Sequence, residues 1–320
     1  MKKILFLLLI PVFSVAQNSF LRIPISSRGL GMGDLGIASA TANQQLYYNV
    51  AKTAFTQNFH QVSVSYMPWL SSISDDTKFM SANYLANISN SSAMGVAVNY
   101  TSLGNLSIRD DNGATLSNYH GSIYNLFGSY ALQLGSKASL GAAFRVIGQN
   151  LYSATSKNAL GVSADLSYYG CRELGSVDNK LEWGLVVSNL GPKFNDESLP
   201  ASFGVGLGYA SIDADNGDSY SVGVDANRLI SGDGSGMRFS AGGEYGFNSE
   251  FFFRGGVSYE SIAAGNRKFI GIGVGYKGLV ADQSCGLDFH YLIPFGVATG
   301  VSPFQNAFGF TLHLSFGNFQ

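Results

Sequence analysis

The chain has 320 residues, of which 46% are apolar, 12% are charged and 40 are glycine, and its formal net charge is −2 at pH 7. The high apolar content and the low charge exclude intrinsic disorder, and the near-neutral balance gives no basic surface for nucleic acid. The longest apolar run, Ile4–Val15, is shorter than the roughly 20 residues that a membrane-spanning helix needs, which excludes a bundle of such helices.

The first sixteen residues have the pattern of a secretory signal peptide. Lys2 and Lys3 precede the apolar run, and the small residues Ser14-Val15-Ala16 end it. A basic start, a short apolar stretch and a small-residue exit are the parts that signal peptides share. We therefore expect residues 1–16 to be cleaved and the mature, exported chain to begin at Gln17.

The next segment, residues 17–60, is expected to form a plug rather than strands, because it is rich in Gly, Ala, Ser and Asn and does not alternate. Its run Gly31–Gly36 has the sequence G-M-G-D-L-G and matches G-x-G-x-x-G literally. A dinucleotide site also needs an acidic residue some 20 positions later, and none occurs between Asp34 and Asp75. We interpret the glycines as close-packing positions of a segment folded inside the mouth of a barrel.

From residue 61 onward, apolar residues alternate with small or polar residues at a period of two. In Phe203–Tyr209, one face carries Phe, Val, Leu and Tyr, and the other carries three glycines. Successive side chains of a strand point to opposite faces, so such segments predict strands with one apolar face. About fourteen segments of this kind start near Gln61, Lys78, Ala93, Ser122, Ala138, Leu160, Lys180, Ser202, Ser219, Met237, Glu250, Lys268, Cys285 and Asn306.

An even number of long strands joined by short turns is typical of an up-and-down barrel. Most segments run for about 8–12 residues, which is close to the 9–11 that a tilted strand needs to cross a bilayer. We predict an all-β fold, a transmembrane antiparallel barrel of about 14 strands over residues 61–320. Among its connections, Leu103–Gly121 and Phe295–Gln305 are expected to be long.

The two strand faces favour a membrane barrel over a soluble sandwich or propeller. A sandwich turns many charged residues to water, and a charged fraction of 12% is too small for that coat. In a membrane barrel the apolar face meets lipid and the polar face lines the lumen. Because unpaired buried charges are costly, we predict that the arginines and carboxylates of the lumen face pair with one another. These lumen charges are Arg145, Asp165, Asp225, Arg238, Glu244, Arg254 and Asp288.

No residue pattern predicts catalysis, a metal or a cofactor. The four histidines are scattered and Cys171 lies far from Cys285, so no Cys/His zinc spacing exists. The cysteines are interpreted as small residues near strand ends, although a disulfide is possible in an exported protein. Asp288 and His290 share one face of a strand and would form a triad with a serine, which leaves an outer-membrane lipase or protease as a disfavoured alternative.

Several ordered blocks resemble the PorV/PorQ branch of the FadL-like outer-membrane barrels, over nearly the whole mature chain. The block Ser27–Ala38 resembles that family's S-R-x-x-G-M-G-x-x-G-V-A. Tyr48–Lys52 lies where the family has W-N-P-A-K, with a tyrosine and a valine in place of its tryptophan and proline. Further matches are Tyr66–Leu70 with a Y-x-P-W-L pattern of the PorV branch, Ser188–Lys193 with Leu199-Pro200, Asp225–Leu229 and Gly243–Tyr245.

The resemblance implies a non-enzymatic role in type IX protein secretion at the outer membrane. Members of the family associate with a very large translocon barrel, accept secreted proteins through their C-terminal targeting domains and deliver them to a surface attachment machinery. A FadL-like uptake channel for hydrophobic small molecules is the alternative, because the same plug and barrel would serve it. Candidate plug-motif residues are Arg28, Gly31, Met32, Gly33, Gly36, Tyr48 and Asn49, and candidate partner contacts are Tyr66, Pro68, Trp69 and Leu70.

Overall fold

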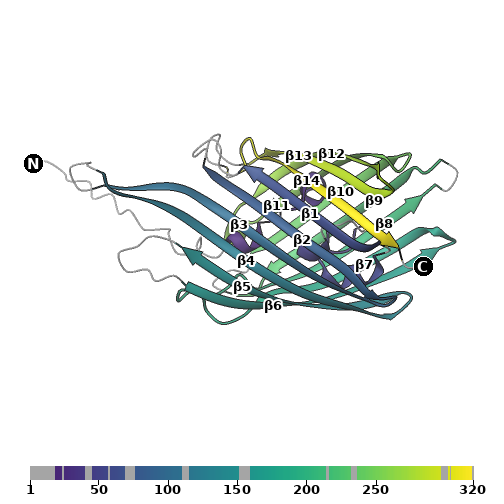
Figure 1. Cartoon of the computed structure of the whole chain (residues 1–320), viewed down its shortest axis with the longest axis horizontal. Helices are drawn as coiled ribbons and strands as arrows, with labels where there is room; N and C mark the ends of the chain where they lie inside the picture. The colour runs from purple at the N-terminus through teal and green to yellow at the C-terminus, as the bar shows by residue number, and fades with distance from the viewer. Residues whose placement is uncertain are drawn as a thin grey trace, which may run out of the picture.

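The computed structural model is a closed antiparallel β-barrel of fourteen strands (Figure 1). It describes residues 19–23, 25–39, 45–56, 58–68, 76–109, 115–150, 159–213, 216–231, 236–296, 302 and 304–318, so the predicted signal peptide, Trp69 and Leu70 lie outside the described residues. The strands are β1 (Asn58–Pro68), β2 (Thr77–Ser89), β3 (Ser92–Arg109), β4 (Thr115–Gly135), β5 (Ala138–Asn150), β6 (Ala159–Leu174), β7 (Ser176–Leu190), β8 (Ser202–Ile212), β9 (Ser219–Leu229), β10 (Met237–Phe247), β11 (Phe251–Glu260), β12 (Lys268–Val280), β13 (Gln283–Pro294) and β14 (Phe308–Asn318). Each strand pairs with its sequence neighbours, and β1 closes the barrel on β14. The predicted barrel is confirmed.

The inner and outer faces of the wall differ as the alternation predicts. On β12, the side chains of Ile270, Ile272 and Val274 are exposed on the outer face, whereas Gly271 and Gly273 between them are buried. Apolar residues on the outside and small or polar residues on the inside are the arrangement of a barrel whose wall contacts lipid hydrocarbon. The outward-facing residues of each strand therefore suit contact with lipid, and the inward-facing residues suit contact with the contents of the barrel.

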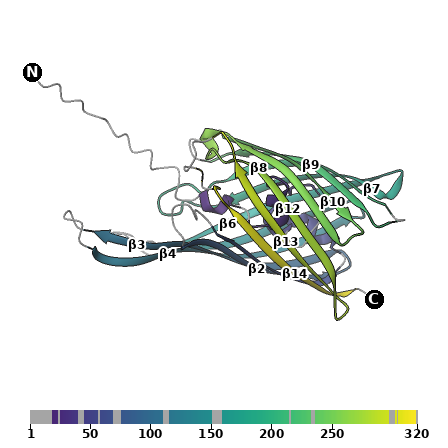
Figure 2. The same cartoon turned by 90° about the horizontal axis from the view of Figure 1, so that it is seen from above.

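Most strands begin within four residues of their predicted starts, with one clear correction. β3 continues to Arg109 and β4 begins at Thr115, so most of the predicted loop Leu103–Gly121 is strand. This part of β3 and β4 extends beyond the last pairs made with β2 and β5 and projects past the other strands (Figures 1 and 2). The alternation missed this projecting hairpin because main-chain pairing outside the membrane needs no apolar face.

The two ends of the barrel differ in the length of their connections. At one end, β4 joins β5 through residues 136–137 and β12 joins β13 through residues 281–282. At the other end, residues 191–201 join β7 to β8 and residues 295–307 join β13 to β14. We call these the short-turn end and the long-connection end. In outer-membrane barrels the short turns face the periplasm and the longer loops face the outside.

In the residues that the structure describes, five short helices accompany the strands: η1 (Ser19–Arg22), α1 (Ser27–Gly31), η2 (Gln45–Tyr47), η3 (Val50–Phe55) and η4 (Ile262–Ala264). Four of them precede β1, and η4 lies between β11 and β12. Of the helices in the described part of the chain, none is both long and apolar enough to cross a membrane.

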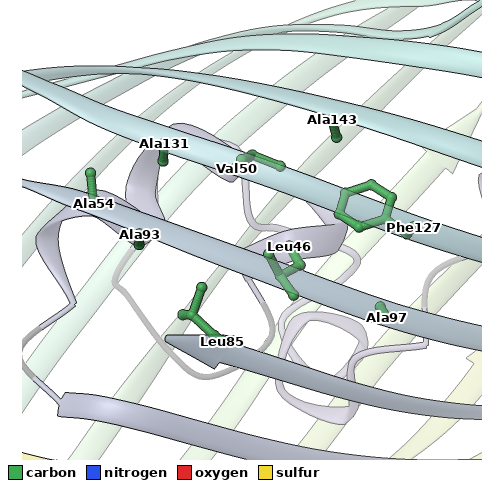
Figure 3. Close-up of a cluster of buried hydrophobic side chains, with 9 residues drawn as sticks. All are labelled: Leu46, Val50, Ala54, Leu85, Ala93, Ala97, Phe127, Ala131 and Ala143. Carbon is green, nitrogen blue, oxygen red and sulfur yellow. The ribbon is translucent and has the colours of Figure 1, made fainter. Parts of the chain in front are cut away.

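A buried apolar cluster joins the residues before β1 to the inner wall (Figure 3). Leu46, Val50 and Ala54 come from η2 and η3. Their partners on β2–β5 are Leu85, Ala93, Ala97, Phe127, Ala131 and Ala143. Small alanines on three of these strands leave room for the helices, so part of the hydrophobic core lies inside the barrel rather than between two sheets.

Candidate functional site

The residues before β1 run through the inside of the barrel, where their short helices appear in purple in Figures 1 and 2. We call residues 19–23, 25–39 and 45–56 the N-terminal segment. At the long-connection end, Arg22 donates to the carbonyl oxygen of Ala264 in η4 at 2.7 Å. Toward the short-turn end, Ser139 of β5 donates to the carbonyl oxygen of Ala51 at 2.7 Å. The segment thus contacts the barrel near both ends.

Glycines allow the main chain of the N-terminal segment to lie directly on the inner wall. Gly33 has φ of 77°, and a Cβ there would overlap main-chain atoms of β11. On the wall, a Cβ at Gly271 would overlap the carbonyl oxygen of Leu30, and one at Gly242 would overlap that of Met32. The G-x-G-x-x-G run is therefore a close-packing motif in this fold, and a phosphate would have no space against it.

Tyr48 and Asn49 hold the two halves of the N-terminal segment together. The ring of Tyr48 occupies the space beside Gly29 and Gly36, where a Cβ would overlap it, and its hydroxyl donates to Asp34 at 3.1 Å. Asn49 caps η3 by accepting from the amide of residue 51 at 3.0 Å, and it donates to the carbonyl oxygen of Ile37 at 2.8 Å. Through these contacts of Tyr48 and Asn49, the structure brings the blocks Ser27–Ala38 and Tyr48–Lys52 together.

A buried ion network fastens α1 to the wall. Arg28 donates twice to the carboxylate of Glu244, through Nε at 2.8 Å and through a terminal nitrogen at 2.7 Å. Glu244 also pairs with Arg254, which reaches Asp288 at 2.7 Å. The four side chains carry two positive and two negative charges, so the network is neutral. A bidentate arginine–carboxylate pair fixes orientation as well as charge.

The other predicted lumen charges lie inside the barrel, with partners that partly differ from the prediction. Arg145 pairs with Asp165, a carboxylate of the predicted lumen set. Arg238 pairs with Asp34 of the N-terminal segment and not with a strand carboxylate. Asp225 accepts from the backbone amides of Gly36 and Ile37, at 2.8 and 2.9 Å, and has no arginine partner among the described residues. The prediction counted charges on the strands alone and therefore missed the partners that the N-terminal segment supplies.

Lys52 is a buried cation that the sequence reasoning did not single out. Its side chain is 2% exposed, and Nζ donates to the carbonyl oxygens of Gly36 and Ser39. Burial lowers the pKa of Lys52 to about 8, although the carboxylate of Glu182 acts in the opposite direction. The signal in the sequence was its place in the block Tyr48–Lys52, but a lysine in a polar block is usually solvated.

A second cluster at the long-connection end also escaped prediction. Arg22 and Arg267 both pair with the carboxylate of Glu260, which is fully buried. The three residues come from η1, the end of β11 and the connection that follows it. No motif or spacing links them, so only the folded chain reveals that the start of the N-terminal segment is tied to the wall.

A cavity of about 110 Å³ lies between the N-terminal segment and the strands on the long-connection side. Apolar residues of its lining include Phe20, Leu21, Ile23, Ile37 and Ile123, and polar ones include Asp34, Asn125, Arg145, Asn189 and Arg238. An engineered apolar cavity that binds benzene measures about 150 Å³. This cavity is smaller and carries ion pairs in its wall, so it has little room for an apolar solute.

Asp288 and His290, the pair that would join a serine in a triad, have other surroundings in the structure. Asp288 and His290 both face inward, but Asp288 pairs with Arg254 and is 3.5 Å from His313, while neither ring nitrogen of His290 has a hydrogen-bond partner. Among the described residues no group of three or more His, Cys, Asp or Glu side chains could hold a metal ion. Both cysteines are free.

Two of the four candidate partner contacts belong to the outer wall at the end of β1. Tyr66 is half-buried against Phe310 of β14, with ring centroids 5.5 Å apart, and Pro68 ends the strand. Because Trp69 and Leu70 lie outside the described residues, their role as partner contacts stays a prediction.

Comparisons with known proteins agree with this fold. Residues 13–232 match the family model described as type IX secretion system protein PorV. A search of curated proteins found no match. The toluene transporter TodX of Pseudomonas putida is 12% identical, with a TM-score of 0.59 over 92% of this chain and 98% of that chain. The CymD monoaromatic hydrocarbon channel is 11% identical, with a TM-score of 0.58 over 92% and 98%. At such identities these structures show the fold alone.

Proposed function

This chain belongs to the PorV family of type IX secretion system proteins, and we propose that it serves that system as a non-enzymatic outer-membrane subunit. In this role it binds the large translocon barrel and secreted proteins, and it passes those proteins to the cell surface. The proposal includes export through a cleaved signal peptide. The family match supports involvement in type IX secretion. The fixed N-terminal segment and the projecting hairpin support a role in binding other proteins.

One observation carries the proposal: the inside of the barrel is taken up by a segment that is fastened at several points. Arg28, Asp34 and Arg22 each form a buried ion pair with the wall. Close glycine packing adds contacts that leave no space for side chains. A barrel whose plug is fixed in this way is poorly suited to diffusion, which favours a function performed by its surface over one performed by its lumen.

The projecting hairpin supplies a surface of the required kind. Beyond the pair Thr77–Leu103, the outer edge of β3 has no described partner strand, and beyond Ser122–Asn150 the same is true of β4. Open strand edges present unpaired main-chain groups that readily pair with another chain. We assign the hairpin as the docking element for the translocon, at the end where the longer connections lie.

The experiment is purification from native membranes in mild detergent, followed by identification of the translocon barrel by mass spectrometry. The test variant replaces residues 106–119 by Asn-Gly, which joins the cross-strand neighbours Asn105 and His120 in a two-residue turn. We expect the barrel to fold and the translocon to be lost. Ser107→Ala, which keeps the main-chain pairing, is the control and should retain it. Undiminished co-purification of the shortened variant would contradict the hairpin assignment.

The alternative function is an uptake channel for hydrophobic small molecules, because structures that share this fold include a toluene transporter and a monoaromatic hydrocarbon channel. A deletion strain separates the two functions. The secretion proposal expects secreted cargo to accumulate in the periplasm while the uptake of apolar solutes stays normal. An uptake defect with normal secretion would instead support the channel.

A further inference from the structure

The outer wall carries an apolar hollow over β8–β11 with a volume of about 340 Å³. Its outward-facing lining consists of Val205, Leu207, Val224, Ala226, Phe239, Ala241, Val257 and Tyr259. Gly206, Asp225 and Ser240 also border it, but they occupy inward-facing positions of their strands, and both polar side chains are buried inside the barrel. The hollow therefore offers almost no polar group to the membrane.

The hollow arises from two small residues set among large ones. Ala226 lies opposite Val205 on one side and Phe239 on the other, and Phe239 lies opposite Tyr259. At the next outward-facing position toward the short-turn end, Ala241 lies opposite Val224 and Val257. The alanines form the floor, and the larger side chains stand around them as a rim.

A concave apolar surface on the lipid-facing wall has to be filled by an apolar group. Water would find no hydrogen-bond partners in the hollow, and an empty space would forfeit dispersion contacts along its whole lining. The surrounding solvent is lipid, whose acyl chains are flexible enough to enter a narrow hollow.

Two cations stand beside the hollow at the long-connection end. Lys268 lies opposite Tyr259, and its Nζ is 4.9 Å from the centroid of that ring. Arg228 is exposed and follows Ala226 by two residues on the same outward face of β9, toward the long-connection end. Across β8–β12, these are the outward-facing charged side chains at this end, and both are basic. The ends of the strands that face the outer leaflet therefore attract anionic headgroups just above the hollow.

We propose that the hollow and these two cations form a binding site for an anionic phospholipid of the outer leaflet. An acyl chain lies along Ala226 and Ala241, and the phosphate sits between Arg228 and Lys268. The site is independent of the proposed role in secretion, because it depends on neither the projecting hairpin nor the N-terminal segment.

Trp183 provides a probe for this site, since it lies on β7 directly opposite Leu207 of the hollow. The sequence has two tryptophans, so Trp69→Phe leaves Trp183 as the only one. The full-length variant is reconstituted in vesicles of equal parts phosphatidylglycerol and phosphatidylcholine, with bromine atoms on the acyl chains of one lipid or the other. We expect brominated phosphatidylglycerol to quench the fluorescence of Trp183 more strongly than brominated phosphatidylcholine.

The charge variants test the headgroup contacts. Arg228→Gln and Lys268→Gln should each lower the preference for phosphatidylglycerol about fivefold, since one basic residue near the membrane surface contributes about that factor. Lys78→Gln on β2, an outward-facing cation of the same end on another part of the wall, should leave the preference unchanged. Equal quenching by both lipids before any substitution, or an unchanged preference after both substitutions, would overturn the proposal.

Ala241→Phe, with Ala241→Leu as a milder second variant, tests the hollow itself and should reduce the preferential quenching. The control is Ala142→Phe, because Ala142 is an exposed, outward-facing alanine on β5. Gel mobility of the unheated protein verifies folding of every variant. If Ala241→Phe leaves the quenching unchanged but abolishes association with the translocon, the hollow belongs to a protein partner and the lipid proposal is wrong.

Discussion

The ion pair between Arg28 and Glu244 offers a test of how the N-terminal segment is held. Replacing Arg28 by methionine leaves Glu244 and Asp288 with Arg254 as their shared partner, so the neutral network acquires one uncompensated negative charge. The side chains of Arg28 and Glu244 are only 10% and 6% exposed. Removing one member of a buried pair typically costs about 3–5 kcal/mol. Because Arg254 stays close to the orphaned carboxylate, we expect about 3 kcal/mol.

Glu244→Gln alone should be similarly destabilising, because it leaves two arginines beside one carboxylate. The double variant Arg28→Met/Glu244→Gln restores neutrality, with Arg254 still paired to Asp288. It should therefore be more stable than either single variant. Since each single variant loses about 3 kcal/mol, this result requires a coupling free energy of about 3 kcal/mol or more, at the upper end of the range for contacting residues.

The assay is urea unfolding of the protein in lipid vesicles, together with proteolysis of the N-terminal segment in the folded barrel. Lys277→Met, which removes an exposed cation of β12, is the control and should change the free energy of unfolding very little. If the double variant lost the sum of the two single effects, the pair would not be coupled, and the account of the segment as held by charge would be refuted.

Three further results are expected. Between pH 8 and pH 10.5, Lys52 is protonated in the unfolded segment but has lost its proton in the folded one. The free energy of unfolding of the N-terminal segment, measured by hydrogen exchange, should therefore rise with pH by up to about 3 kcal/mol, and the Lys52→Met variant should lack this rise. Val274→Arg on the lipid-facing middle of β12 should cost about 2–4 kcal/mol in bilayer unfolding, whereas Tyr276→Arg, on the same outward face but nearer the strand end, should cost about 0–1 kcal/mol. Equal costs would contradict the placement of Val274 closer to the bilayer midplane than Tyr276. Gly33→Ala should free the N-terminal segment to proteases, because its φ of 77° and the adjacent main chain both oppose a side chain, while Gly128→Ala, with open space at its Cβ, should not.

The sequence alone determined the barrel, because every membrane-crossing strand must turn an apolar side chain outward at each second residue. That repeated requirement predicted fourteen strands and most of their starts, as at Ala138, Ser202 and Lys268. It failed at the hairpin of β3 and β4, where the chain leaves the membrane and the requirement ends. The sequence also identified the family, because the glycines and polar residues of the motif blocks occur at the same spacings as in that family.

Only the tertiary structure decided what the inside of the barrel does with its charges. Asp34 pairs with Arg238 and Arg22 with Glu260, across more than two hundred residues in each case. A strand pattern records that a side chain faces inward, but it carries no information about which inward-facing groups are opposite each other across a lumen. Those partners are set by the path of the N-terminal segment, and that path is fixed by the glycine positions of β10–β12, where the main chains can touch because no side chain intervenes.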